Sequence, residues 1–590
     1  MRLRARPISR GTKAALAGLL AVSLLAAGCG GASEGSKKGG EKLADKKLDS
    51  AAGESGLDKA GSPKRGGKLI YGLEADTNGG FCLPEGQLAI SGMMIVRAVY
   101  DTLTVPNEAG EYVPYLAKAI THNDAYTEWN IELREGIKFH DGSDLNAEVV
   151  KNNLDAYRGT YEGRSSLLFS FVLKNVKAVD AVDDMNVKVT TTKPWVAFPS
   201  YLYSSSRLGI MAQAQLDATD DCATKPIGTG PFVFQSWTPN QKLVAKANPD
   251  YWQIAPDGKP YPYASSIEFR PITDGQVRNQ AIEAGDINIM HTSNGDDIGN
   301  KLLKLRDAGK LNMFVSEDSG EVAFIQLNHT IAPFDDLRVR QALAMGADRN
   351  DINNIINDGL PTIADGPFAP DSVAYVKDPG FPKFDEAKAK ALIADYVKDG
   401  GKADFTLEST TDPTTQKLAE IIQQRAKKSG LTVKVVLRDQ AALINDAIGK
   451  KYQAMLFRNY PGGDPDSLYV WWYSGDKDAS GKVTAPNLVN FAGFQDPEVD
   501  KLLDEGRSEP DPAKRKTIYQ DLNKRMATQV HGLWSWYTPW AVVEAADVHG
   551  ILGPPLPGAD ASKPSSADDK DFAPNRGLAT GHSLLGLWIS

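Results

Sequence analysis

The chain is poor in the residues that build catalytic and metal centres. Its 590 residues include only three cysteines and seven histidines. No Cys-x-x-Cys pair, no His-Glu-x-x-His motif and no Gly-x-x-x-x-Gly-Lys-Ser/Thr loop occurs in it. These are the local patterns of zinc, metalloprotease and nucleotide sites. The sequence therefore predicts no catalytic residue, no metal site and no cofactor.

Long apolar runs are equally scarce. The run at residues 14–27 would span about 21 Å as a helix, against a hydrocarbon core of about 30 Å, and no later stretch approaches a membrane span. Five basic residues precede the run: Arg2, Arg4, Arg6, Arg10 and Lys13. A basic segment followed by a short apolar run is the layout of a secretory signal peptide. We therefore expect residues 1–28 to be removed on export.

The end of this run bears on membrane attachment. Its last residues, LLAAGC at 24–29, resemble the bacterial lipobox, with Ala26 where a leucine is usual. The resemblance implies that Cys29 is acylated and becomes the first residue of the mature chain. Because two or more acyl chains give a stable anchor, we expect the protein to be held at the outer face of the cell membrane. The alternative is a signal peptide cut elsewhere, with Cys29 incidental.

The mature chain also lacks the basic excess of a nucleic-acid-binding protein. Without the signal peptide, 61 basic residues face 75 acidic ones, which gives a formal charge of −14. Binding to nucleic acid depends on neutralising phosphates with Lys and Arg. Nucleic acid is therefore excluded as a partner.

Residues 29–65 contain no aromatic residue and are rich in Gly, Ser, Ala, Lys, Glu and Asp. Such a composition buries too little apolar surface to fold, so we predict a flexible, lipid-anchored linker. Over the whole chain, 42% of residues are hydrophobic, which is ample for several folded domains.

Cys82 and Cys222 remain after Cys29 is assigned to the anchor. Disulfides are permitted outside the reducing cytosol, and we predict that these two cysteines pair. Two separate buried thiols are the alternative, because spacing alone does not establish bridging distance.

From residue 66 onward, strand and helix patterns alternate. Strands are predicted at 68–73, 128–134 and 186–192, and helices at 95–103 and 147–157.

The clearest unit lies between residues 405 and 436. A strand at 405–408 is followed by Asp412 and Pro413, a helix cap and a first helical residue. Gly430 marks the end of the helix, and a second strand follows at 431–436. A strand, a helix and a strand of these lengths predict a parallel βαβ crossover and an α/β fold.

Four segments carry a family resemblance. They are WNIELREGIKFHDGS at 129–143, PIGTGPF at 226–232 with NPDYW at 248–252, APFDD at 332–336 with RVRQAL at 338–343, and FDEAKAKALI at 384–393. Together, in this order, they resemble the extracytoplasmic solute-binding proteins of ABC importers, family 5, which includes the oligopeptide- and dipeptide-binding lipoproteins. The resemblance covers residues 66 to 590.

The resemblance implies a two-lobe α/β fold of the periplasmic-binding-protein type, with a hinge and an additional domain inserted in lobe one. The expected limits are 66–107, 213–318 and 535–590 for lobe one, 108–212 for the inserted domain and 319–534 for lobe two.

The resemblance also implies a place for the ligand. In members that take peptides, the α-amino group pairs with an Asp just before a Tyr-Pro or Asp-Pro element. The matching stretch here, FRNYPGGDPD at 457–466, has Asn459 at that position. Losing a charge partner in a desolvated cleft costs several kcal/mol. Asp464 is the candidate replacement, and Arg458 is suited to a carboxylate.

The full set of predicted ligand-binding residues is Ser91, Gly92, Met93, Met94, Phe457, Arg458, Asn459, Tyr460, Asp464, Trp471 and Trp472. Methionine and tryptophan offer adaptable and broad contact surfaces. Ordinary core packing is the alternative for each of them.

The expected function is that of a monomeric, lipid-anchored receptor that captures a peptide or a related small solute and delivers it to the permease subunits of an ABC importer. Alternatives are a non-peptide solute such as an oligosaccharide, an opine or a metal chelate, a sensor or adhesin role, and a secreted lipoprotein enzyme using Asp464 and Asp466.

Overall fold

The computed structural model describes residues 61–77, 79–86, 88–166, 168–317, 321–459, 462–558, 573–574 and 583–590. These residues all fall within Gly40–Ser590, which forms one unit by its internal contacts. The predicted signal peptide, Cys29, most of the predicted linker and Tyr460 lie outside the described residues. None of the helices in the described ranges combines the length and apolar character that a membrane span requires.

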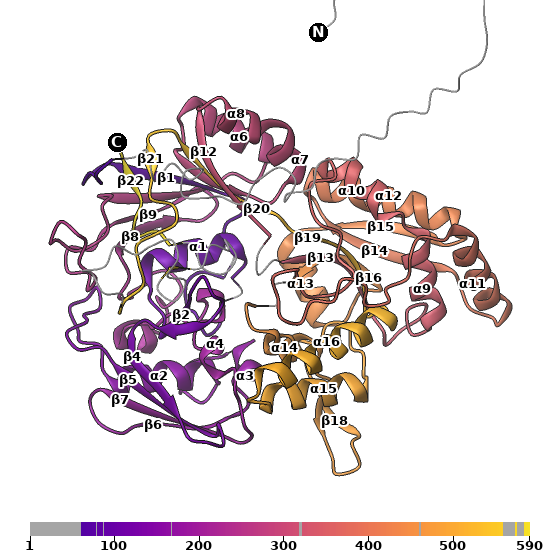
Figure 1. Cartoon of the computed structure of the whole chain (residues 1–590), viewed down its shortest axis with the longest axis horizontal. Coiled ribbons are helices and arrows are strands. Elements are labelled where there is room, and N and C mark those ends of the chain that lie inside the picture. Colours follow the sequence, from indigo (N-terminus) through magenta and orange to yellow (C-terminus); the bar gives the residue numbers. More distant parts are fainter. Residues whose placement is uncertain are drawn as a thin grey trace, which may run out of the picture. The chain divides into compact units, whose positions relative to one another are not determined.

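Lobe one is built on a seven-stranded mixed sheet (Figure 1). β1 runs parallel to β10 and β11, and the other neighbours are antiparallel. The strand order is β12 (Leu311–Ser316), β20 (Trp540–Ala545), β11 (Ile289–Thr292), β1 (Lys68–Leu73), β10 (Ser266–Pro271), β9 (Lys242–Ala247) and β8 (Phe232–Thr238).

Both faces of this sheet are covered. α1 (Ile90–Val99) packs with Leu69 and Tyr71 on one face. Met290 and Val543 pack on the other face with a second set of helices, so the sheet is buried on both sides. The second set is α6 (Gly275–Ala284), α7 (Gly295–Asp297), the π-helix η3 (Ile298–Leu302) and α8 (Leu303–Asp307).

The inserted domain has its own antiparallel sheet with the order β4-β5-β7-β6, and helix α2 contacts β6 and β7. Its strands are β4 (Ala117–His122), β5 (Glu128–Leu133), β6 (Val176–Ala181) and β7 (Asn186–Thr191). Beside them lie the hairpin of β2 (Thr104–Pro106) and β3 (Tyr112–Pro114) and the helices α2 (Ala147–Tyr157), α3 (Phe169–Val172), α4 (Phe198–Tyr201), η2 (Ser204–Ser206) and α5 (Gln213–Asp217).

Lobe two contains a five-stranded mixed sheet in the order β15-β14-β16-β13-β19 (Figure 1). Its strands are β13 (Val322–Leu327), β14 (Asp404–Thr410), β15 (Thr432–Arg438), β16 (Ala454–Asn459) and β19 (Gly532–Tyr537). Its other elements are α9 (Leu337–Gly346), α10 (Arg349–Asn357), α11 (Glu386–Lys398), α12 (Pro413–Lys428), α13 (Gln440–Ile448), η4 (Pro465–Ser467), α14 (Leu468–Trp472), the hairpin β17 (Gly475–Lys477) and β18 (Val483–Pro486), α15 (Pro497–Ser508) and α16 (Pro512–Thr528).

The predicted βαβ crossover is confirmed as β14, α12 and β15. The Asp412 side chain accepts a hydrogen bond from the Thr415 backbone amide at 2.8 Å. Gly430 has a φ of +88°, a left-handed conformation that ends the helix at low cost. β14 and β15 then pair in parallel. The two-lobe α/β fold expected from the sequence is therefore present.

The chain passes twice between the two large sheets. The first crossing joins β12 to β13 and the second joins β19 to β20. Because Tyr537 still pairs with Val322, β19 continues beyond the expected lobe boundary at 534, and the second crossing falls at residues 538–539. The Thr538 amide donates to the Glu321 carbonyl at 2.7 Å, so the two crossings are hydrogen-bonded to each other. β21 (Val548–His549) and β22 (Trp588–Ile589) form a final pair in the C-terminal part of lobe one.

The predicted helix at 95–103 was wrong in its limits. The helix is α1, which begins at Ile90 and ends at Val99, and residues 91–94 lie inside it instead of before it. Its N-cap is Ala89, which provides no side-chain cap, and so the usual sequence signal for a helix start is missing.

Cys82 and Cys222 form a disulfide in lobe one. It links the segment before α1 to the segment after α5, 140 residues later. Glu85 lies beside the two sulfur atoms, but because both sulfurs are in the disulfide this group is not a metal site.

Candidate ligand-binding region between the lobes

Arg458 marks the place where side chains of the two lobes meet. It lies on β16 of lobe two and donates from Nη1 to Ser293 Oγ of lobe one at 2.9 Å. The same nitrogen lies 3.4 Å from Glu321 Oε2 at the first crossing. The guanidinium also lies over the Trp540 ring, 5.6 Å from its centroid. We call Glu74, Arg278, His291, Ser293, Glu321, Arg458 and Trp540 the Arg458 cluster.

Lobe one supplies a carboxylate to this cluster. Glu74 directly follows β1, and its side chain accepts from the Ser293 amide at 2.8 Å and the Ser293 hydroxyl at 3.1 Å. Arg278 Nη2 lies 3.4 Å from Glu74 Oε1. Burial alone would raise the pKa of Glu74, but the neighbouring positive charges, Arg278 first, hold it below its usual value. Glu74 is therefore ionised at neutral pH and holds Ser293 in place.

His291 on β11 is a titratable member of the cluster that stays uncharged at neutral pH. Its Nε2 accepts from the Glu74 amide at 3.1 Å and lies 3.1 Å from Ser91 Oγ. Burial lowers the pKa of His291 to about 4. An imidazole that accepts from a backbone amide at Nε2 cannot also be protonated there, so the contact agrees with the low pKa.

Arg458 is the exposed cation of the cluster. Its side chain is 45% exposed, whereas that of Arg278 is 3% exposed. The pKa of Arg458 is raised, first of all by Glu321. Within the described part of the chain, its Nε and Nη2 have no hydrogen-bond partner. This free edge of the guanidinium has the geometry for a bidentate bond to a carboxylate.

Of the four predicted residues on α1, only Ser91 reaches the cluster. Met93 and Met94 are fully buried in the core of lobe one. Gly92 is packed so tightly that a Cβ there would lie 2.9 Å from Leu88 Cδ2. These three residues lie in the core.

The predicted aromatic residues of lobe two lie in the core of the lobe or at its edge. Trp472 is 2% exposed and packs against Phe324 and Trp534. Phe457 and Trp471 are half-buried, and each packs against Phe491 with 5.8 Å between ring centroids. Trp472 is thus a core residue, and the other two line the core edge.

Neither candidate for the amino-group anchor offers a free carboxylate. Asn459 ends β16, pairs with Val322 of β13 and is buried. Asp464 forms a bidentate ion pair with Arg515, at 2.6 Å and 3.0 Å. It also accepts from the Asp466 amide at 2.8 Å, which begins η4.

Most of the Arg458 cluster was not predicted from the sequence. The residues without a prediction are Glu74, Arg278, His291, Ser293, Glu321 and Trp540. Glu74 and Ser293 each directly follow a strand, β1 and β11, and these strands are parallel neighbours. Ligands of open α/β sheets lie outside the carboxyl ends of such strands, so knowledge of the strand order would have pointed to both residues.

A separate pocket lies between lobe one and the inserted domain, lined in part by Asp101, Tyr115, Tyr251 and Gln253. Burial raises the pKa of Asp101 to about 6. The carboxyl group accepts hydrogen bonds from Thr229, Tyr251 and Trp252, at 3.0 to 3.2 Å. Because these donors already satisfy it, we assign Asp101 a structural role.

Comparison with known proteins agrees with this architecture. The family model described as bacterial extracellular solute-binding proteins, family 5 middle, matches residues 111–480. The chain belongs to this family. The match spans the inserted domain, part of lobe one and most of lobe two, so membership rests on the whole arrangement of this solute-binding protein and not on one motif.

Curated relatives cover most of this family 5 protein. The oligopeptide-binding protein AppA of Bacillus subtilis is 26% identical over 509 residues, which is 81% of this chain and 87% of AppA. The glutathione-binding protein GsiB of Escherichia coli K12 is 26% identical over 427 residues, or 72% of this chain and 80% of GsiB. These relatives are binding proteins and not enzymes.

Solved structures show the same fold. AppA of B. subtilis in complex with a nonapeptide superposes with a TM-score of 0.72 at 22% identity, covering 90% of this chain and 100% of AppA. AgaA of A. tumefaciens R10 in complex with agropinic acid gives a TM-score of 0.73 at 24% identity, covering 89% and 99%.

Proposed function

We propose that this chain is the lipid-anchored, monomeric substrate-binding component of an ABC importer, which captures a peptide or a related small solute between its two lobes and delivers it to the membrane permease. The observation that carries the proposal is Arg458. It projects from lobe two onto Ser293 and Trp540 of lobe one and keeps one edge of its guanidinium free.

The chemistry of the relatives' ligands supports a carboxylate contact. A free peptide and glutathione both carry carboxylates, and agropinic acid is an acid. In this chain Arg458 is the exposed group of the cluster that matches such a ligand. We therefore propose that Arg458 binds a carboxylate of the solute.

A non-peptide acid is the second candidate, and one observation favours it. A peptide binder of the expected type uses a free carboxylate for the ligand's α-amino group. Here that position is Asn459, and Asp464 is already bound to Arg515. A solute without a free ammonium group needs no such partner.

Native mass spectrometry of protein purified without denaturation tests the proposed function, because a tight complex keeps its solute through purification. Titration with a mixed-sequence nonapeptide, glutathione and agropinic acid then separates the two candidates. Binding of the peptides with a free α-amino group supports the first, and binding of agropinic acid alone supports the second. Binding of no solute by either method contradicts both.

Lipid anchoring is tested separately with Cys29→Ser in cells. The expected result is release of the protein from the membrane fraction and reduced solute uptake, with unchanged solute affinity of the purified protein. Continued membrane association of the variant would contradict anchoring through Cys29.

A further inference from the structure

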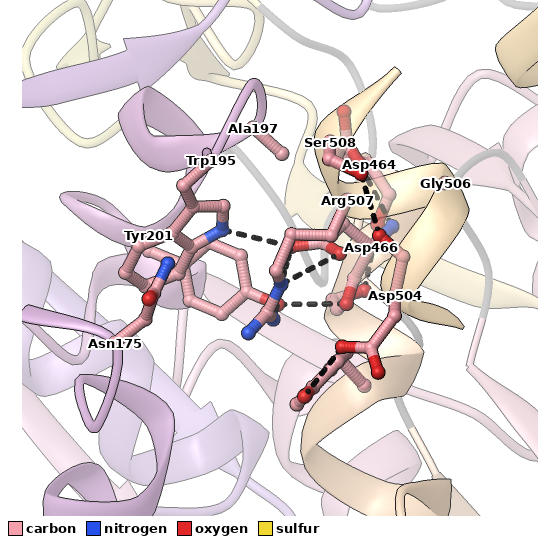
Figure 2. A network of polar contacts seen from close by, with 12 residues as sticks. Asn175, Trp195, Ala197, Tyr201, Asp464, Asp466, Asp504, Gly506, Arg507 and Ser508 are labelled. Atoms are coloured by element: carbon pink, nitrogen blue, oxygen red, sulfur yellow. Dashed lines mark hydrogen bonds and ion pairs between the residues drawn. The ribbon is translucent and has the colours of Figure 1, made fainter. Parts of the chain in front are cut away.

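Asp466 lies at a buried contact between the inserted domain and lobe two (Figure 2). Its side chain is fully buried. Arg507 of α15 donates from Nε to both carboxylate oxygens at 3.1 Å. Trp195 of the inserted domain donates from Nε1 at 2.9 Å, and Tyr519 of α16 donates from its hydroxyl at 3.2 Å. The carboxylate thus accepts hydrogen bonds from both sides of the contact.

A second set of bonds surrounds the first. The Tyr201 hydroxyl of the inserted domain donates to the Asp466 carbonyl at 2.7 Å and accepts from Arg507 Nη2 at 3.0 Å. The Val196 amide donates to the Arg507 carbonyl at 3.0 Å. Figure 2 shows Trp195 and Tyr201 pointing toward Asp466 and Arg507. We call these five residues, with Tyr519, the Asp466 clasp.

The ion pair of the clasp belongs to lobe two alone. Burial would raise the pKa of Asp466, but Arg507 holds it below its usual value, so the pair is ionised at neutral pH. If the inserted domain moves away, Asp466 and Arg507 stay paired with each other and gain water. Separation therefore leaves no unpaired buried charge, which is the costly outcome for such pairs. This makes the contact suitable for repeated opening.

The clasp also holds residues 462–466, which come shortly after Arg458 in the chain. Asp466 lies eight residues after Arg458, and residues 464 and 466 are bound to Arg515 and Arg507. The inserted domain contacts this segment again at Gly463, whose amide donates to the Tyr112 hydroxyl at 3.2 Å. Exposed ion pairs, Lys193 with Asp504 and Lys174 with Asp476, lie at the edge of the contact.

We propose that the Asp466 clasp is a reversible closure contact, through which the inserted domain docks on lobe two when the lobes approach and fixes residues 462–466. The inserted domain then acts as a third closing element, and Trp195 and Tyr201 are positioning residues. This inference rests on the proposed function, because only a protein that opens and closes needs such a contact.

The test uses the full, solute-free protein, so it does not depend on the identity of the solute. Tyr201→Phe removes a hydroxyl from the inserted-domain side of the clasp. Tyr519→Phe removes a hydroxyl that donates to the Asp466 carboxylate from within lobe two, and it is the matched control. The readouts are hydrogen exchange of the Val196 amide, the radius of gyration from small-angle scattering, and the melting temperature.

Tyr201→Phe is expected to speed Val196 exchange about tenfold and to increase the radius of gyration, with little change in melting temperature. Tyr519→Phe is expected to leave exchange and radius as in the parent protein. Two results would overturn the proposal. One is an equal effect of the two variants. The other is a Val196 amide that exchanges only through global unfolding in the parent protein and in both variants. These measurements need no solute, so they can still be made if the solute-binding tests give a negative result. A failure of the proposed function can therefore be distinguished from a failure of the closure contact.

Discussion

Arg458 and Arg507 are both arginines of lobe two that contact another part of the protein, and their surroundings differ. Arg507 is 7% exposed, pairs with a fully buried Asp466 and lies 3.5 Å from the Tyr469 ring centroid. Arg458 is 45% exposed, and its ion-pair partner Glu321 is 3.4 Å away. A buried cation is costly to leave without its partner, whereas a half-exposed cation with a free edge is available to a ligand.

The largest effect is expected from removing the partner of Arg507. Asp466→Ala leaves a buried guanidinium without its carboxylate, and such a loss costs about 3–5 kcal/mol of unfolding free energy. Urea denaturation of the full protein measures this loss of unfolding free energy. Asp476→Ala, which breaks an exposed ion pair at the same contact, is the control and should cost less than about 1 kcal/mol. If Asp466→Ala and Asp476→Ala lowered the unfolding free energy equally, the buried ion pair would be no more important to stability than the exposed one.

His291 gives the next effect, and it depends on pH. Burial lowers the pKa of His291 from 6.5 to about 4, with Glu74 raising it and Arg278, Arg458 and Arg97 lowering it. The folded state keeps its full unfolding free energy above pH 6.5. Part of it is lost as the pH falls from 6.5 to about 4, because His291 takes up a proton in the unfolded chain at a higher pH than in the folded protein. At about 1.4 kcal/mol per pKa unit, the loss is about 3 kcal/mol.

His291→Gln tests this, because the glutamine oxygen accepts from the Glu74 amide without titrating. The unfolding free energy of the parent protein should fall between pH 7 and pH 4 by about 3 kcal/mol more than that of the variant. Parallel pH profiles would show that His291 is not a neutral acceptor in the folded protein.

The smallest effect on stability is expected at Arg458. Its ion pair with Glu321 is partly exposed, and such pairs contribute about 0–1 kcal/mol. Arg458→Gln should therefore change the urea midpoint only slightly. A cost near that of Asp466→Ala would mean that Arg458 is a structural residue, and the comparison between the two arginines would fail.

The sequence predicted those elements whose signals are local. Helix α2 has the predicted limits 147–157, and its Asn146 cap accepts from the Val149 amide at 3.0 Å. Helix α1 was placed wrongly because its ends depend on tertiary contacts. Nine of its ten residues are buried, so no amphipathic stripe is present. Its C-terminal end meets the backbone of 228–230, where the Gly230 amide donates to the Val99 carbonyl at 2.9 Å.

The candidate site was predicted in part for the same reason. Arg458 and Asn459 could be located because they lie on one stretch that resembles a family motif. Glu74 and Ser293 directly follow β1 and β11, and Trp540 begins β20. These three strands are far apart in the sequence, and only the strand order of the sheet brings the residues near Arg458. A sequence pattern within one segment cannot show which distant segments lie close together in the fold.

The most direct test of the account is solute binding by Arg458→Gln and Arg458→Lys, measured by calorimetry with the solute that native mass spectrometry finds on the parent protein. We predict that Arg458→Gln weakens binding at least tenfold while its urea midpoint stays near that of the parent, and that Arg458→Lys recovers part of the affinity. Unchanged affinity in Arg458→Gln would contradict the assignment of Arg458 as the carboxylate contact between the lobes.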